Sequence, residues 1–397
     1  MKTLAQSYNQ SLISPFNMTQ LPQICFGNGV FSQLVSHIIR WGKRPLLVTG
    51  ASSFRKTPQW STLIEELTHV GITYETYAIA GEPTPDQVDQ AVTQFSGQVD
   101  VVVGLGGGSA LDAAKAIGGL LGLPEPFAVR DFLEGVGVER AYTGPSLPFI
   151  AVPTTAGTGS ELTKNAVITQ HGAGGFKKSF RDDQLLAKVA IVDPELLHSC
   201  PRSVMVANAM DALTQLIESY TSPKANPMTL ALVESGLTHF VAAFDPSQVQ
   251  PVNDYAGIAY AAMISGLCLA QTGLGAVHGI ASPLGAYFSI PHGEACGILL
   301  ADTTAVNVAA MHARDLDNVA LCRYHKVAEL LGCGGTHELV ALMHLWQCEA
   351  QLPSLSSFGI TEQDFASIVA ASGGNSMKTN PIKLSPDELE AILLACI

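Results

Sequence analysis

The stretch VVVGLGGGSALDAAKAIG, residues 101–118, passes from an apolar β-branched run through a glycine-rich turn into an alanine-rich segment that carries Asp112. This order predicts a strand, a tight turn and the first turns of a helix. Glycines let the backbone approach a ligand closely, and the first N–H groups of a helix carry partial positive charge without an intrahelical partner. A pyrophosphate suits such a turn, and its predicted contacts are Gly106, Gly107, Gly108 and Ser109.

The spacing of this turn differs from the G-x-G-x-x-G pattern of dinucleotide-binding folds, because Ser109 stands where the third glycine would be. The alternative interpretation is a glycine-rich turn that serves only close packing of a strand against a helix. The strands and helices predicted around this turn help to choose between the ligand-binding and the packing interpretation.

Strand and helix patterns alternate through the first half of the chain. Strand-like runs lie at 21–30, 45–50, 72–81, 99–104, 147–155 and 189–194, and amphipathic helical patterns at 57–71 and 85–95. Such a series predicts a parallel, Rossmann-like sheet covered by helices on both faces. Beyond residue 194 the patterns are helical, at 202–222, 227–244, 253–272, 300–312, 315–332, 336–351, 361–372 and 386–396. We therefore expect an α/β dinucleotide-binding domain at 1–194 and an all-helical domain at 195–397.

Composition narrows the classes of partner. The chain has 397 residues, of which 47% are hydrophobic and 14% charged, as in a globular protein. Its net charge of -13 disfavours nucleic acid or an anionic membrane as a partner. The eight cysteines form no C-x-x-C pair, which predicts reduced thiols and no disulfide. Because the N-terminus lacks the apolar core of a signal peptide, we expect a cytoplasmic protein.

One uncharged stretch calls for a membrane test. No Asp, Glu, Lys or Arg lies between Asp254 and Glu294, a length that could cross a bilayer. Pro283, several polar residues and the glycines at 257, 266, 273, 275, 279 and 285 interrupt it too often for a helix that faces lipid. A buried central helix followed by a loop at the functional site is the expected structure.

A second turn-rich loop, VPTTAGTGSE at 152–161, follows the predicted strand at 147–155. Its hydroxyls and bare backbone could donate hydrogen bonds to phosphate or ribose. Taken alone it is an ordinary loop, but the carboxyl edge of a parallel sheet would bring it beside the first turn.

Four polar side chains in the helical half form a candidate metal site. Asp211 and Gln215 are four residues apart and share a helix face, while His278 and His292 lie in the glycine-rich segment 273–295. One carboxylate and two imidazoles suit Zn²⁺ or Fe²⁺. The alternative is that these widely spaced residues are unrelated.

Several motifs together resemble the iron-containing (group III) alcohol dehydrogenase family. They are GGGSALDAAKA, VPTTAGTGSE, VAIVDPEL, NAMDALTQLIESY and the pair VHGIASPLG and PHGEA, in that order. The resemblance implies a dehydroquinate synthase-like fold with a metal between its α/β and helical domains. It implies that Gly107, Gly108, Ser109 and Asp112 contact pyrophosphate and ribose, that Thr154, Thr155 and Thr158 line the nicotinamide side, and that Lys177 reaches the ribose. Asp211, His278 and His292 match the family's metal ligands.

Two positions depart from the family pattern, which has histidine where this chain has Gln215 and Ser282. A neutral amide oxygen is a weaker ligand than imidazole, so we expect Gln215 to be a weak fourth ligand or a group that orients the site. Serine does not titrate near neutral pH. Proton transfer is therefore expected to pass through water or a ribose hydroxyl of the coenzyme.

The resemblance predicts an NAD(P)-dependent alcohol dehydrogenase or aldehyde reductase. Hydride would move between nicotinamide C4 and a small alcohol or carbonyl substrate, with the help of one divalent metal, Fe²⁺ or Zn²⁺. Two alternatives stay open: a non-redox enzyme similar to dehydroquinate synthases, and a nucleotide-binding protein that has lost its metal. The resemblance also implies a homodimer that pairs through residues 1–30.

The coenzyme preference rests on the end of the strand at 45–50. In family members that prefer NAD, an aspartate often follows this strand and repels a 2′-phosphate. Here Gly50 is followed by Ser52, Ser53, Arg55 and Lys56, with no carboxylate among them. We expect NADP(H) to be accepted at least as well as NAD(H), with Gly50 and Ser52 among the cofactor contacts. The alternative is that Arg55 and Lys56 are solvated at the start of a helix.

Overall fold

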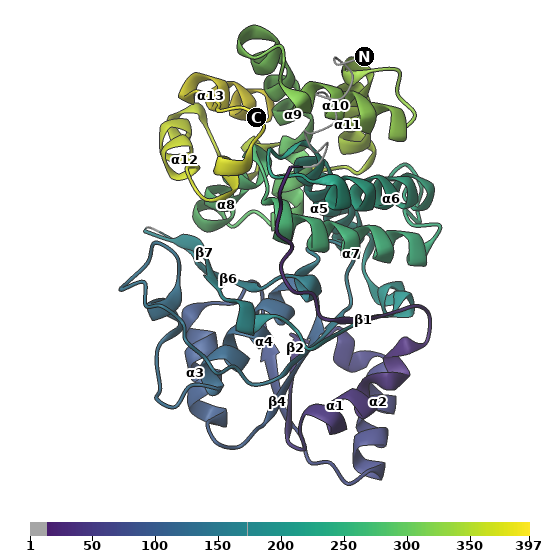
Figure 1. Cartoon of the computed structure of the whole chain (residues 1–397), viewed down its shortest axis with the longest axis vertical. Helices are drawn as coiled ribbons and strands as arrows, with labels where there is room; N and C mark the ends of the chain where they lie inside the picture. The colour runs from purple at the N-terminus through teal and green to yellow at the C-terminus, as the bar shows by residue number, and fades with distance from the viewer. Residues whose placement is uncertain (1–13, 173) are drawn as a thin grey trace, which may run out of the picture.

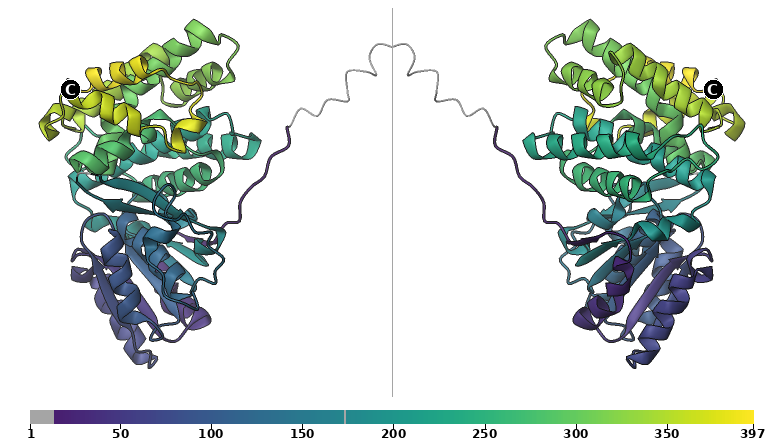
Figure 2. Two further views of the ribbon diagram at one scale, coloured as in Figure 1. Left: turned by 90° about the vertical axis from the view of Figure 1, so that its left-hand side faces the viewer. Right: turned by 90° about the vertical axis from the view of Figure 1, so that its right-hand side faces the viewer.

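The computed structural model describes residues 14–172 and 174–397 (Figure 1). An α/β half, which ends at β8 (Val189–Val192), lies below a helical half that begins with α5 (Arg202–Thr221). Both side views keep this two-part arrangement (Figure 2). Part of the segment at 1–30 that we expect to mediate pairing lies outside the described residues.

The α/β half is built on one six-stranded sheet in the order β1-β8-β5-β4-β2-β3, with every pair parallel. Its other strands are β1 (Gln23–Phe26), β2 (Pro45–Gly50), β3 (Glu75–Ile79), β4 (Val101–Gly106) and β5 (Phe149–Pro153). The predicted parallel sheet is confirmed. The short strand β1 forms one edge of the sheet and β3 forms the other.

Helices cover both faces of this sheet. α1 (Leu34–Trp41) and α2 (Pro58–His69) pack on one face, and α3 (Pro85–Phe95) and α4 (Gly108–Leu121) on the other (Figure 1). Side chains alternate along β2, so that Leu47 joins the core under α1 and α2 while Leu46 and Val48 join the core under α3 and α4. Burial on both faces explains the nearly continuous apolar runs of the strands.

The strand order creates a crevice between β2 and β4. The chain leaves β2 toward the neighbouring edge strand β3, but it leaves β4 in the opposite direction, toward β5. In open parallel sheets, ligands bind at such a reversal, outside the carboxyl ends of the strands. Gly50 ends β2 and Gly106 ends β4, so both glycines lie at this crevice.

An antiparallel hairpin that the sequence patterns did not predict lies between the two halves. It consists of β6 (Asn165–Gln170) and β7 (Phe176–Arg181) and packs against both α4 and α8 (Ala276–Phe288) (Figure 1). The hairpin therefore forms part of the boundary between the sheet and the helical half.

The helical half surrounds α5, which is buried on nearly all sides. Its other helices are α6 (Pro227–Ala243), α7 (Tyr255–Thr272), α8, α9 (His292–Arg314), α10 (Val319–Leu330), α11 (Thr336–Glu349), α12 (Phe365–Ala371) and α13 (Pro386–Ala395). Short 3-10 turns connect elements in both halves, at Val30–Gln33, Phe54–Lys56, Val129–Phe132, Ser160–Leu162, Asp183–Leu185, Pro194–Ser199, Leu355–Phe358, Glu362–Asp364 and Ser376–Thr379.

The expectation of a glycine-rich loop after the central helix was wrong. Most of 273–295 is helical, because α8 runs through Pro283 and α9 begins at His292 rather than near residue 300. Burial of Val277, Ile280 and Leu284 outweighs the weak helix propensity of glycine and proline in α8. The other predicted helices are present, although the one expected at 361–372 shortens to a 3-10 turn followed by α12.

Two helices, α7 and α9, are long and apolar enough to cross a membrane by length and composition. In each, 67% of the most apolar window is buried inside the fold. Core helices of globular proteins have this character, as we expected for the uncharged stretch after Asp254.

Candidate active site

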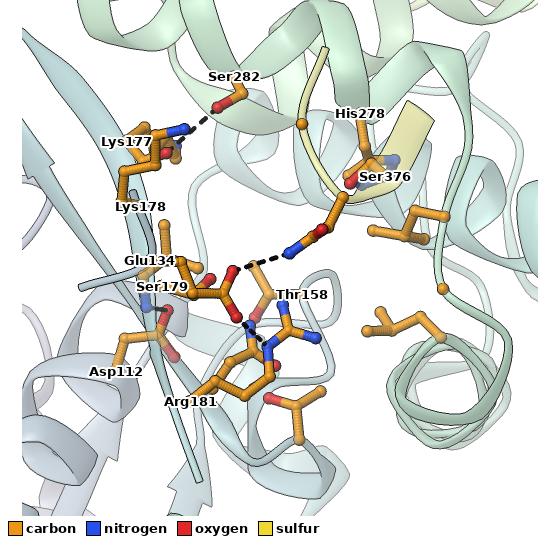
Figure 3. Close-up of a pocket in the computed structure, with 18 of the residues that line it drawn as sticks. Asp112, Glu134, Thr158, Lys177, Lys178, Ser179, Arg181, His278, Ser282 and Ser376 are labelled. Atoms are coloured by element: carbon orange, nitrogen blue, oxygen red, sulfur yellow. Dashed lines mark hydrogen bonds and ion pairs between the residues drawn. The ribbon is translucent and has the colours of Figure 1, made fainter. Parts of the chain in front are cut away.

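A cleft of about 850 Å³ separates the two halves of the chain. Figure 3 shows His278 and Ser282 of α8 on the helical side, facing Asp112, Thr158 and Lys177 of the α/β side. The predicted site residues that line the cleft are Gly108, Ser109, Asp112, Thr158, Lys177, Gln215, His278 and His292. Gly50, Ser52, Gly106, Gly107, Thr154, Thr155 and Asp211 are not part of its lining.

The two predicted turns pack against each other at the carboxyl edge of the sheet. Gly107 caps α4, and the Thr154 N–H donates to the Gly106 carbonyl at 3.0 Å. A Cβ atom on Gly108 would lie 2.7 Å from the methyl and hydroxyl of Thr158, closer than real Cβ contacts. Glycine is therefore required there by the close approach of the second loop.

Asp112 is held in a network behind the cleft. Its Oδ1 accepts from Ser160 Oγ at 2.5 Å and Lys115 Nζ at 3.3 Å, while its Oδ2 accepts from the Val167 N–H at 3.0 Å. The Lys115 ammonium is fully buried, and burial lowers its pKa. These bonds tie the first turn of α4 to the second loop and to β6, and so fix the floor of the cleft.

A compact cluster of metal-binding side chains from three helices lies at the helical side of the cleft, with His278 and His292 in the cleft lining. Asp211 lies on α5, His278 on α8, and His292 is the first residue of α9, with Cys296 one turn later. One potential ligand atom from each of the four lies within 4.8 Å of the others. The structure thus brings together the three residues that the sequence singled out, and it adds a thiol.

Close helix packing produces this convergence. A Cβ atom on Gly293 would lie 2.4 Å from the Ala207 carbonyl oxygen, so only glycine lets the start of α9 approach α5. His292 and Asp211 are thereby brought to 3.9 Å between Nε2 and Oδ1.

Glu218 fixes the orientation of His278. Its Oε2 lies 2.6 Å from His278 Nδ1, and its Oε1 accepts from the Val277 N–H at 2.8 Å. A carboxylate on Nδ1 holds the proton on that nitrogen and turns Nε2 toward a metal. His278 Nε2 lies 3.3 Å from Asp211 Oδ1, so it does face the cluster.

The electrostatics of the cluster suit a cation. Burial raises the pKa of Asp211, but His292, His278 and the Gln215 side chain together hold it at about 2. Burial and the Lys177 ammonium lower the pKa of His292 to about 4, which keeps that imidazole neutral. Within residues 14–172 and 174–397, Asp211 Oδ2 and His292 Nδ1 are buried without hydrogen-bond partners. A buried carboxylate oxygen with no partner is costly, and a bound cation would remove that cost.

Gln215 lies one turn after Asp211 and is buried, as its spacing predicted. Its amide oxygen accepts a hydrogen bond from Ser265 Oγ of α7 at 2.7 Å. The oxygen is the only atom of this side chain that can bind a cation, and the hydrogen bond from Ser265 occupies one of its two lone pairs.

Lys177 projects from β7 and is ion-paired across the cleft floor. Its Nζ lies 2.5 Å from Glu82 Oε1, and the hydroxyl of Thr169 donates to Glu82 Oε2 at 2.6 Å. Ser282 Oγ donates to the Lys177 carbonyl at 3.3 Å, linking α8 to the hairpin (Figure 3). Asn375 makes a second link between the halves by donating to Glu134 at 3.0 Å.

The residues after β2 divide into two groups. Arg55 turns inward, where its Nε donates to Thr49 Oγ1 at 2.9 Å and its guanidinium lies over Trp60. Ser52, Ser53 and Lys56 are exposed. These three side chains are the accessible members of the predicted phosphate-binding group.

Three side chains of the candidate site were missed by sequence reasoning: Glu82, Glu218 and Cys296. Glu218 follows Asp211 at i+7 and Gln215 at i+3 on one helix face, a spacing that could have found it. Cys296 stands at i+4 from His292, but only a helix beginning at residue 292 reveals that spacing. Glu82 follows β3 at the carboxyl edge of the sheet, where a carboxylate is informative.

Comparisons with known proteins cover nearly the whole chain. The family model described as iron-containing alcohol dehydrogenase matches residues 22–194, and that of the Fe-containing alcohol dehydrogenase family C-terminal region matches residues 205–397. Alcohol dehydrogenase 4 of Schizosaccharomyces pombe is 31% identical over 92% of this chain and 86% of its own length. NADPH-dependent butanol dehydrogenase of Clostridium saccharobutylicum is 30% identical over 93% of this chain and 95% of its own. An archaeal halo-thermophilic alcohol dehydrogenase from a Red Sea brine pool superposes with a TM-score of 0.88 at 25% identity, covering 98% of this chain and 100% of that one.

Proposed function

The chain belongs to the iron-containing alcohol dehydrogenase family and is an NAD(P)-dependent oxidoreductase of alcohols and aldehydes, and from this premise we propose that Asp211, His278 and His292 hold its divalent metal. The observation that carries the proposal is the convergence of these three side chains from three helices in the cleft beside the N-terminus of α4. Burial of an unpartnered Asp211 oxygen supports a cation there.

We propose that the coenzyme lies across the crevice between β2 and β4. Its pyrophosphate would meet the N–H groups at 106–109 and the positive end of α4. The ribose nearer the adenine, or the pyrophosphate, would be contacted by Gly50, Ser52 and Asp112. The nicotinamide side would be lined by Thr154, Thr155 and Thr158. Lys177 would reach the second ribose. The ion pair of Lys177 with Glu82 would hold its ammonium at the cleft.

A divalent ion at the cluster would polarise the oxygen of an alcohol or carbonyl while nicotinamide C4 takes or gives hydride. Glu218 keeps His278 in the tautomer that presents Nε2, and the buried helices exclude bulk water from Asp211. Ser282 makes a hydrogen bond to the Lys177 carbonyl and carries no titratable group. The substrate proton would therefore reach water or a ribose hydroxyl.

We propose a small alcohol or aldehyde as substrate, in line with the butanol dehydrogenase among the relatives. We also propose that NADP(H) is used at least as well as NAD(H), since Ser52, Ser53 and Lys56 are free to meet a 2′-phosphate and the NADPH-dependent relative covers most of the chain. A kcat/KM for NADH more than about tenfold above that for NADPH, roughly 1.4 kcal/mol, would overturn this preference.

We further propose that residues 1–194 and 195–397 act as coenzyme and metal domains, and that the enzyme is a cytoplasmic homodimer. The position of β1 at the edge of the sheet, among the residues that the structure describes, and the partly exposed Phe26 in this strand support pairing through it. Light scattering at micromolar concentration would reveal a monomer if the pairing does not occur.

The test of the function is a substrate panel. Short-chain alcohols, diols, hydroxyacids and the corresponding carbonyls are incubated with zinc- or iron-loaded protein, and reduced coenzyme is followed by its near-ultraviolet absorbance. We expect net redox turnover by the wild type. We expect Asp211→Asn to lose this turnover and to retain coenzyme binding. Coenzyme binding without turnover on any member of the panel would contradict the proposal.

A further inference from the structure

Cys296 is the fourth member of the cluster with Asp211, His278 and His292. It lies one turn after His292 on α9 and is fully buried. Its Sγ is 3.8 Å from Nε2 of both His278 and His292. A cysteine buried among apolar side chains would need no such neighbours, whereas a sulfur ligand would require them.

The separations within the cluster match one tetrahedral ion. Metal bonds of 2.0–2.3 Å to nitrogen, oxygen and sulfur place neighbouring tetrahedral ligands roughly 3.3–3.6 Å apart. The observed separations from Asp211 Oδ1 are 3.3 Å to His278 Nε2 and 3.9 Å to His292 Nε2, and those from sulfur are 3.8 Å. These four separations lie within a few tenths of an ångström of the tetrahedral values, and all four atoms lie within 4.8 Å of one another.

The amide of Gln215 is a weaker ligand for this place than a thiolate. Its oxygen accepts the Ser265 hydroxyl hydrogen, and its NH₂ group has no lone pair to offer a cation. Among the histidine, cysteine and carboxylate groups of the described residues, the sulfur of Cys296 is the one that joins Asp211, His278 and His292 within 4.8 Å.

We propose that Cys296 is the fourth protein ligand of the metal, so that this chain has an Asp-His-His-Cys site which a substrate oxygen would join as a fifth ligand. This inference rests on the metal site put forward under Proposed function. The thiol proton leaves to solvent as the metal–sulfur bond forms, so the thiolate contributes one negative charge beside that of Asp211. Because a thiolate is a soft ligand, the site favours zinc over iron(II) more strongly than an all-nitrogen and oxygen set would.

Cobalt substitution tests directly whether Cys296 binds the metal, and it needs no measurement of enzymatic activity. The metal-free protein, residues 1–397, is titrated anaerobically with Co²⁺, and the absorbance spectrum is recorded. We expect one equivalent to bind with a strong thiolate-to-cobalt charge-transfer band in the near ultraviolet. Cys296→Ala and Cys296→Ser should lose this band and bind Zn²⁺ on the order of 10- to 100-fold more weakly.

Two control variants assign the band. Cys268→Ser changes a thiol on α7 that is equally buried but bonded to the Thr229 carbonyl, and it should keep the wild-type spectrum and affinity. Asp211→Asn should lose both the bound cobalt and the band, which excludes binding at exposed cysteines.

The possible outcomes separate this inference from the proposed function. Stoichiometric cobalt without a charge-transfer band in the wild type would overturn the Cys296 ligand and leave the three-ligand site standing. Wild-type cobalt binding that survives Asp211→Asn would overturn both. Because the first outcome is read from the wild type, it holds even if a Cys296 variant fails to fold.

Discussion

Glutamine in place of Glu218 is predicted to weaken metal binding without touching a ligand. The Glu218 carboxylate accepts two hydrogen bonds, from His278 Nδ1 at 2.6 Å and from the Val277 N–H at 2.8 Å. Glutamine keeps one acceptor oxygen, so either the imidazole or the backbone N–H loses its partner. If the amide NH₂ faces His278, it also favours the tautomer with its proton on Nε2, which cannot bind a metal.

The size of the effect follows from these two bonds. One buried donor left without an acceptor costs about 1–3 kcal/mol, which should appear as a lower free energy of unfolding in the metal-free protein. Loss of the carboxylate behind a histidine ligand lowers metal affinity by about 10- to 100-fold. That range corresponds to roughly 1.4–2.7 kcal/mol of binding free energy.

Two measurements check this prediction. Zn²⁺ titration by calorimetry gives the affinity, and guanidinium unfolding of the metal-free protein gives the stability. Glu338→Gln is the control, because that exposed carboxylate accepts a backbone N–H from Gly334 far from the cluster, and neither quantity should change. Wild-type zinc affinity in Glu218→Gln would refute the role of Glu218 in orienting His278.

Three further substitutions test other parts of the structure. Burial raises the pKa of Glu161 to about 7 from its ordinary 4.5. Between these two pH values the folded state keeps a proton that the unfolded state loses. The free energy of unfolding therefore falls by up to about 3 kcal/mol as the pH rises from 4.5 to 7. Glu161→Gln should remove this fall in the free energy of unfolding, measured with denaturant from pH 5 to 8. A variant that shows the same dependence of stability on pH as the wild type would contradict the prediction. Gly108→Ala places a methyl group 2.7 Å from a threonine side chain and should raise the coenzyme Kd about tenfold, whereas Gly118→Ala on the same helix meets ordinary contacts and should not. Equal coenzyme affinity in both variants would argue against binding at this turn. Lys177→Met removes a cation near His292 and should raise the pKa of that imidazole above about 4. NMR titration of the metal-free protein would measure the change. An unchanged pKa would exclude an effect of Lys177 on His292.

The sequence was most informative where local pattern and tertiary structure agree. The apolar run of β4, the glycines after it and the alanine-rich start of α4 each favour the same strand–turn–helix, and the structure contains it. The alternating β and α patterns likewise led to the observed parallel sheet. Asp211 and Gln215 were placed on one helix face because their spacing alone determines it.

Prediction failed where distant contacts decide the local structure. Glycine and proline in 276–288 argue against a helix, but the buried side chains of α8 stabilise one. The error hid the relation between His292 and Cys296, since it placed both in a loop. The β6–β7 hairpin was also missed, because its β7 strand, FKKSFR, carries three cationic side chains and packs against α8 from the other half.

The central claim is that the Asp211, His278 and His292 cluster holds the metal on which turnover depends, and His278→Ala tests it most directly. Metal content is measured by elemental analysis after loading, together with coenzyme-linked turnover and coenzyme affinity. The account predicts that the variant loses stoichiometric metal and turnover while its coenzyme affinity stays within about threefold of wild type, since the glycine turn is untouched. If His278→Ala retains both its metal and its turnover, the metal is bound elsewhere and the account is wrong.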